Sequence, residues 1–131
     1  MRQGSSAALI SVIFLAMVSW SEAADWPQWR GPHFNGSSEE TDLPSDWSQT
    51  DNIAWSAPLP SASAATPIVS GGKVFVSGAD TEKDILQAYC FDRTDGKLLW
   101  SHDIEGTVRR DNLSTYAAPS PATDGENVIF F

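Results

Sequence analysis

Short β-type runs alternate with tight-turn residues between residues 65 and 104, and this alternation constrains the fold more than any other feature. β-Branched and aromatic residues fill the runs, which are separated by Gly71-Gly72, by a charged loop and by a turn containing Gly96. Such residues favour extended strands, and glycine accepts the positive φ that hairpin turns require. The pattern predicts four antiparallel strands, at residues 67–69, 73–78, 85–91 and 98–104.

The flanking segments carry weaker β patterns. No segment after residue 23 has a convincing 3.6-residue apolar period, so the predicted fold class is all-β. Residues 24–51 predict an irregular segment that its aromatic side chains pin to a core. Residues 52–59 predict a strand that ends at Pro58, which has no backbone N–H to donate. A last hairpin is expected at residues 121–123 and 128–131, after a polar loop at 105–116.

The chain also repeats itself. Residues 66–76 align with residues 120–130, and Ile53–Ser56 aligns with Leu98–Ser101. Both spacings suit a four-stranded unit of roughly 40 to 50 residues, as in propeller blades. The repeat predicts a partial β-propeller with one complete blade and parts of neighbouring blades. One such sheet cannot bury both faces alone and needs adjacent blades. A small independent β-sandwich is the alternative.

The N-terminus has the features of a targeting segment. Arg2 precedes an apolar run from Ala7 to Val18, and small residues stand at Ser21 and Ala23. The run is shorter than the roughly 20 apolar residues that span a bilayer. We therefore expect a signal helix in a signal peptide of residues 1–23, cleaved after Ala23, and a secreted or periplasmic protein with no stable membrane span. An uncleaved anchor is the alternative.

Charge and cysteine content exclude several function classes. The formal net charge of −9 argues against nucleic acid as a partner, because phosphate binding needs clustered Lys and Arg. Cys90 is the single cysteine, so no intrachain disulfide can form. We interpret it as a small buried hydrophobe. The six Trp residues are expected to act as packing anchors.

Residues 86–100 resemble a known repeat. Their pattern Leu-x-x-Tyr-Cys-Phe-Asp-x-x-x-Gly-Lys-x-x-Trp is similar to that of the PQQ-like (quinoprotein) β-propellers. In that family the Trp docks between blades, on a small residue and on the turn glycine. The resemblance implies a docking contact of Trp100, Gly96 and Cys90, with Trp55 as the equivalent Trp of the preceding strand. Cys90 replaces the usual Ala, and Asp95 replaces the usual Thr.

The resemblance also suggests an origin and a domain plan. The Asp-Trp-Pro-Gln-Trp-Arg-Gly-Pro run at residues 25–32 looks like the start of secreted propellers of planctomycete-type bacteria. Residues 52–131 then form the partial PQQ-like propeller, with the full blade at about residues 65–104. The sequence stops within the apolar run 128–131, and an unpaired apolar edge invites aggregation. We therefore expect a fragment of a longer repeat protein.

We assign no catalytic, cofactor-binding or metal-binding residue to this chain. Asp92 and Asp95 with Gly96 suggest a calcium loop only faintly, and a solvated turn is favoured because the distal Glu of an EF-hand is missing. PQQ is expected only in a full-length relative. A chain of this kind offers an architectural unit, and a common fold hosts many functions.

The favoured function is a non-catalytic binding or scaffold module, whose partners are other proteins or the remaining blades. A related propeller is the lipoprotein scaffold of outer-membrane protein assembly, although no cysteine follows the apolar run here to carry a lipid. The alternative is the N-terminal part of a PQQ-dependent alcohol or sugar dehydrogenase, an oxidoreductase whose active site lies in missing blades.

Overall fold

The computed structural model describes residues 23–109 and 117–131. The predicted signal peptide lies outside the described residues except for Ala23, and so do residues 110–116 of the expected loop. The described part contains β-strands and no helix, so no helix there is long and apolar enough to cross a membrane. The all-β prediction is confirmed.

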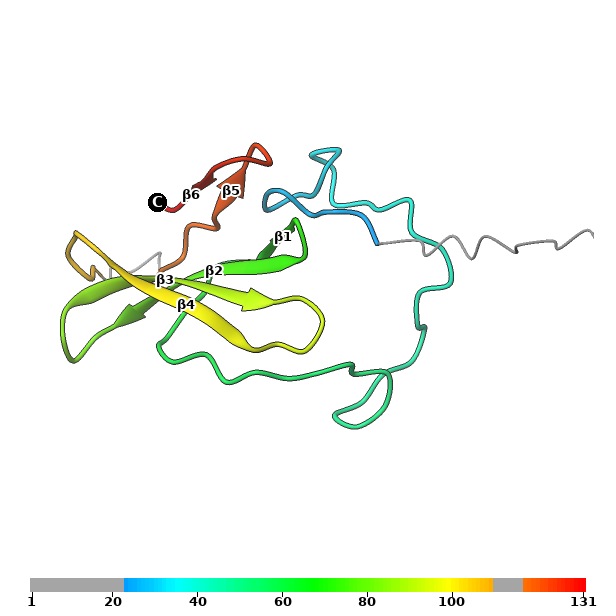
Figure 1. Ribbon diagram of the computed structural model, residues 1–131, viewed down its shortest axis with the longest axis horizontal. Coiled ribbons are helices and arrows are strands. Elements are labelled where there is room, and N and C mark those ends of the chain that lie inside the picture. The colour runs from blue at the N-terminus through cyan, green and yellow to red at the C-terminus, as the bar shows by residue number, and fades with distance from the viewer. Residues whose placement is uncertain (1–22, 110–116) are drawn as a thin grey trace, which may run out of the picture.

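The main sheet is an antiparallel meander of four strands in the order β1-β2-β3-β4 (Figure 1). Each strand lies next to the one before it because short turns join them. The bounds are close to those predicted. The β2–β3 ladder includes the pairs Asp80–Ile85 and Lys73–Asp92, so β2 runs on to Asp80 and β3 runs on to Asp92. The strands are β1 (Ile68–Ser70), β2 (Lys73–Asp80), β3 (Ile85–Asp92) and β4 (Leu98–Ile104).

A second, two-stranded sheet repeats the start of the first. It consists of β5 (Ala122–Thr123) and β6 (Val128–Ile129). In the main sheet Ile68 pairs with Phe75. The residues that align with this pair in the internal repeat, Ala122 and Ile129, are also paired. The second sheet therefore reproduces the β1–β2 register, which confirms the repeat as the beginning of another blade.

Residues 52–59 do not form the predicted strand. Within the described chain, no neighbouring strand pairs with them. The local backbone is also unsuited to a ladder, because Asn52 has a φ of 58° and Pro58 has no N–H to donate. The segment is held by the side chain of Trp55 instead, as shown below. The prediction of a strand over this segment is wrong.

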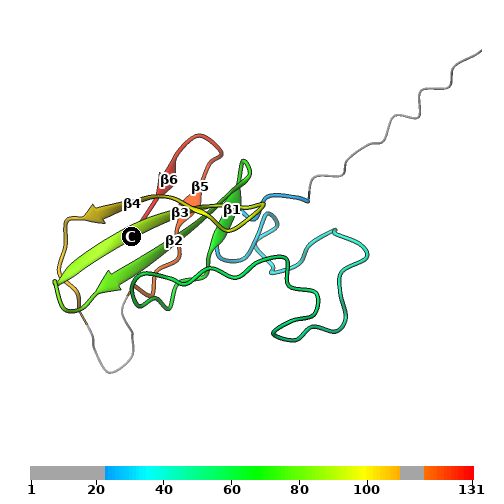
Figure 2. The ribbon, with the colours of Figure 1, turned by 60° about the horizontal axis from the view of Figure 1, so that its bottom comes forward.

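Each face of the main sheet is covered by a different part of the chain. Ile68, Phe75, Cys90 and Trp100 form one cross-strand row, because each is paired with the next. Val128 and Phe130 of the second sheet pack against this row. On the opposite face a second core consists of Val76, Tyr89 and Phe91 from β2 and β3. Ala57 and Ala65 of the 57–65 connector pack against it. Figure 2 shows the β5–β6 hairpin and this connector on opposite sides of the sheet.

The irregular N-terminal segment is fixed along the edge of β1. Trp26 and Val69 form an isolated antiparallel bridge, with both backbone hydrogen bonds made, at 2.8 and 2.9 Å. The carbonyl oxygen of Pro27 accepts a hydrogen bond from the N–H of Thr123 in β5. The segment therefore ties the first blade to the second, and an edge that would otherwise be free is covered.

Candidate functional site

The turn between β3 and β4 is built as a platform for the indole of Trp55. The N–H of Gly96 donates to the carbonyl of Asp92, and the N–H of Asp92 donates to the carbonyl of Lys97. Gly96 has a φ of 72°. A Cβ added there would lie 2.4 Å from the Trp55 ring. Only glycine allows this approach, because any side chain would strain the backbone and overlap the ring.

A directed hydrogen bond orients the same indole. Trp55 Nε1 donates to the carbonyl oxygen of Arg93 at 2.7 Å. The ring is therefore held by a polar contact at one end and by packing on Gly96 at the other. A half-buried Trp normally finds such a partner for its N–H.

Trp100 lies on the face of the main sheet opposite to the one that packs against the 57–65 connector. Its ring centroid lies 6.1 Å from that of Phe75 and 6.5 Å from that of Phe130, the latter in an edge-on arrangement. Cys90 lies directly opposite Trp100 in the β3–β4 ladder. Trp100 thus lies between the complete blade and the beginning of the next.

The residues that the sequence analysis grouped into one docking contact belong to two contacts. Gly96 meets Trp55, whereas Cys90 and Trp100 face the second sheet. Gly96 lies in the turn between β3 and β4. Trp100 lies within β4, opposite Cys90, and its side chain is on the face of the sheet that packs against β5 and β6. A docking role between blades stays a prediction for all four residues.

An apolar groove of about 290 Å³ lies on the Trp55 side of the blade. It is formed where the connector of residues 57–65 crosses the apolar residues of β2 and β3. The sequence analysis did not identify it, because the groove exists only once the connector lies on the sheet. Its lining includes Trp55, Ala57, Leu59, Val74, Val76 and Phe91.

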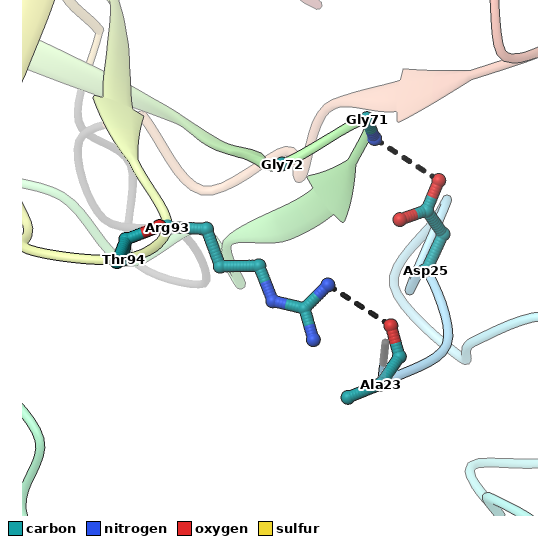
Figure 3. A pocket seen from close by; sticks show the side chains of 6 residues that line it. All are labelled: Ala23, Asp25, Gly71, Gly72, Arg93 and Thr94. Atoms are coloured by element: carbon teal, nitrogen blue, oxygen red, sulfur yellow. Dashed lines mark hydrogen bonds between the residues drawn. The ribbon is translucent and has the colours of Figure 1, made fainter. Parts of the chain in front are cut away.

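A larger and more polar pocket, of about 760 Å³, lies where the N-terminal segment meets the hairpin turns (Figure 3). The carboxylate of Asp25 accepts hydrogen bonds from the hydroxyl of Ser70 at 2.9 Å and from the N–H of Gly71 at 3.1 Å. Arg93 Nη1 donates to the carbonyl of Ala23 at 2.9 Å. The sequence analysis missed Asp25 and Arg93, although the positive-φ pair Gly71-Gly72 was a signal that backbone N–H groups would be presented here.

Asp carboxylates cap the hairpin turns. Asp92 accepts from the N–H of Thr94, and Asp124 accepts from the N–H groups of Glu126 and Asn127. These backbone N–H groups lower the pKa of Asp92 and the pKa of Asp124. For Asp80 the hydrogen bond to the Lys83 side chain is the first cause of a lowered pKa. Such bonds stabilise the charged carboxylate and so stabilise the turns.

The two aspartates of the faint calcium-loop pattern, Asp92 and Asp95, form hydrogen bonds within their turn. Asp95 accepts from the N–H of Lys97, so Asp92 and Asp95 both cap their own turn rather than converge. Within residues 23–109 and 117–131, no three His, Cys, Asp or Glu side chains lie close enough to share a metal ion. Burial raises the pKa of the Cys90 thiol, which keeps it protonated and poorly nucleophilic.

Comparison with known proteins agrees with this architecture. No curated protein and no solved structure matches the chain significantly. A family model described as outer membrane protein assembly factor BamB matches residues 42–131, about two thirds of the chain. The match covers the segment with Trp55, the complete blade and the β5–β6 hairpin, which are the parts that carry the repeat. The chain belongs to this family of PQQ-like β-propeller repeat proteins.

Proposed function

We propose that this chain is part of a non-catalytic β-propeller module, secreted or periplasmic, that binds or scaffolds other proteins. The apolar run and small residues of the N-terminus support export, and the family description supports a role in outer membrane protein assembly. In this proposal the chain is a piece of a longer repeat protein, and further blades complete the propeller.

One observation carries the proposal: each face of the complete blade carries apolar and aromatic side chains that pack against another part of the chain. Trp100 and its row pack against the next blade on one side. On the other side Trp55 and the apolar groove lie beside the connector. Aromatic and aliphatic surfaces of this kind stabilise contacts between proteins or blades. Asp92 and Asp124 cap their own turns and so contribute to the stability of the blade.

The proposal assigns the partner to the class of proteins that assemble the outer membrane. The test measures binding of the exported full-length protein to purified outer-membrane assembly components by biolayer interferometry. We expect saturable binding that salt weakens only modestly, because apolar contacts carry it. Absence of binding to every component would contradict the assembly role.

A parallel assay separates this role from the dehydrogenase alternative. The same protein is mixed with PQQ, Ca²⁺, an alcohol or a sugar, and a redox dye. The proposal predicts no dye reduction above that of a heat-denatured sample. Sustained, PQQ-dependent dye reduction would replace the scaffold assignment with an oxidoreductase.

A further inference from the structure

The residues that follow Ala24 are hydrogen-bonded to β1 and to the turn after it. The side chain of Asp25 binds Ser70 and Gly71, and the backbone of Trp26 bridges to Val69. These contacts begin one residue after Ala24. The position of the Ala24 nitrogen is therefore defined by the fold rather than by the segment that precedes it.

The carboxylate of Glu40 lies beside that nitrogen. The backbone nitrogen of Ala24 donates to Glu40 Oε1 at 2.5 Å. Glu40 is half-buried and sits on a loop whose geometry is set locally, since its own N–H donates to the hydroxyl of Ser38 at 3.1 Å. This loop and the N-terminal segment line a pocket of about 450 Å³ that also contains Asp25, Glu39 and His33. His33 Nε2 lies 3.9 Å from Glu39 Oε1, and the three carboxylates outnumber this imidazole.

We propose that this pocket binds the α-ammonium group of the mature protein. The inference rests on the cleaved signal peptide of the proposed function. Hydrolysis of the Ala23–Ala24 peptide bond consumes one water: its oxygen completes the carboxylate of Ala23, and its two hydrogens convert the Ala24 amide N–H into –NH₃⁺. The new cation forms at the atom that already contacts Glu40. A hydrogen bond from a neutral amide to the Glu40 carboxylate thereby becomes an ion pair, in which both groups are charged.

The same cleavage removes a contact of the uncleaved chain. Arg93 Nη1 donates to the carbonyl of Ala23, and that carbonyl leaves with the signal peptide. Asp25 lines the same pocket as Arg93 and is the acidic residue among those that line it (Figure 3). Arg93 therefore loses a hydrogen-bond partner on cleavage, whereas Glu40 keeps the Ala24 nitrogen as its partner and that nitrogen gains a positive charge.

The experiment measures the reactivity of the N-terminal amine in the exported full-length protein. The first residue is identified by N-terminal sequencing, and an amine-selective ester then acylates the α-amine near neutral pH. We expect Glu40→Gln to raise the acylation rate about two- to five-fold, the range expected for a partly exposed ion pair. Glu105→Gln removes the same charge from an exposed position elsewhere and should leave the rate unchanged.

Salt gives a second readout that needs no variant. High ionic strength screens an ion pair, so added salt should raise the acylation rate of the unsubstituted protein more than that of Glu40→Gln, in which only Asp25 and Glu39 remain as carboxylates of the pocket. If Ala24 is the first residue and the unsubstituted protein and Glu40→Gln are acylated at equal rates, the inference is overturned while the cleavage position stands. A first residue other than Ala24 would overturn both the cleavage position and the inference.

Discussion

The indole of Trp55 lies directly over Gly96, and a Cβ on that glycine would come within 2.4 Å of the ring. The two residues are far apart in sequence, and their contact joins the segment before the blade to the turn between β3 and β4. It shows how one glycine can serve two purposes, since Gly96 also needs its φ of 72° to complete the turn.

Replacement of Gly96 should therefore cost more than backbone strain. We expect Gly96→Ala to destabilise the protein by about 2–4 kcal/mol, because strain at a positive φ adds to overlap with Trp55. Gly72→Ala is the matched control: its φ is 73°, and nothing lies within 4 Å of an added Cβ. Urea denaturation should show a smaller loss of unfolding free energy for Gly72→Ala than for Gly96→Ala. Equal losses would mean that Trp55 does not rest on Gly96.

A double-mutant cycle should isolate the same contact. Once Trp55 is replaced by Ala, the overlap at Gly96 is gone, so Gly96→Ala in that background should cost only about 1–2 kcal/mol of strain. The coupling is measured as the difference between the two effects of Gly96→Ala. Additive effects would contradict the contact.

The hydrogen bond from Trp55 Nε1 to the carbonyl of Arg93 makes a separate contribution. Trp55→Phe keeps an aromatic ring but removes this donor. We expect a loss of about 1 kcal/mol or somewhat more, which includes some lost packing area. Thermal denaturation measures it, and an unchanged melting temperature would show that the donor is satisfied equally well by water.

Cys90 should tolerate a small apolar replacement better than a polar one. It is fully buried in the row with Phe75 and Trp100. Cys90→Ala should cost about 1 kcal/mol through a small cavity. Cys90→Ser should cost about 1–3 kcal/mol because its hydroxyl would be buried among apolar groups. The order of the two melting temperatures checks this, and a more stable Ser variant would contradict the apolar environment.

The folded protein should also protect the Cys90 thiol. Burial raises its pKa, so the thiolate that reacts with maleimides is scarce at neutral pH. We expect labelling only when urea unfolds the chain. Rapid labelling of the native protein would mean that the row opens readily.

Acid should weaken the turns that Asp carboxylates cap. The pKa of Asp124 is lowered by the N–H groups of Asn127 and Glu126 from a value of 3.8. Because the folded pKa is the lower one, this stabilisation is present above pH 3.8 and is lost as the pH falls through the folded value. Melting temperatures between about pH 7 and about pH 3 should fall less steeply for Asp124→Asn.

Glu126→Gln is the control for that prediction. It removes the same charge from the same turn, whereas the backbone N–H groups bind Asp124. We expect the acid dependence of the control to match that of the unsubstituted protein. A flattened profile in Glu126→Gln alone would assign the effect to net charge rather than to the cap.

Local patterns were enough to predict the blade. The runs of β-branched and aromatic residues and the turn glycines predicted β1 to β4 closely, and the 54-residue repeat predicted the pairing of β5 with β6. Residues 52–59 failed because a strand needs a neighbour to pair with, and periodicity carries no information on which neighbour is present.

The contacts at the candidate sites were harder to predict for the same reason. The partner of Gly96 and the bonds of Asp25 and Arg93 depend on which turns meet in space. Side chains distant in sequence form them, so no local spacing encodes them. The repeat indicated that Trp55 and Trp100 are packing residues, but it did not indicate that Gly96 contacts Trp55.

We expect Trp100 to dock the second blade onto the first, because Phe75 of the first and Phe130 of the second both lie beside its ring. A two-stranded hairpin such as β5–β6 is marginal alone and needs packing to persist. Amide hydrogen exchange of the Trp100→Ala protein tests this directly. Its matched control is Leu99→Ala, which truncates an exposed neighbour on β4. We predict faster exchange at Thr123 and in β6 with Trp100→Ala and not with Leu99→Ala, while β2 and β3 stay protected. Unchanged exchange in β5–β6 would contradict the docking role of Trp100.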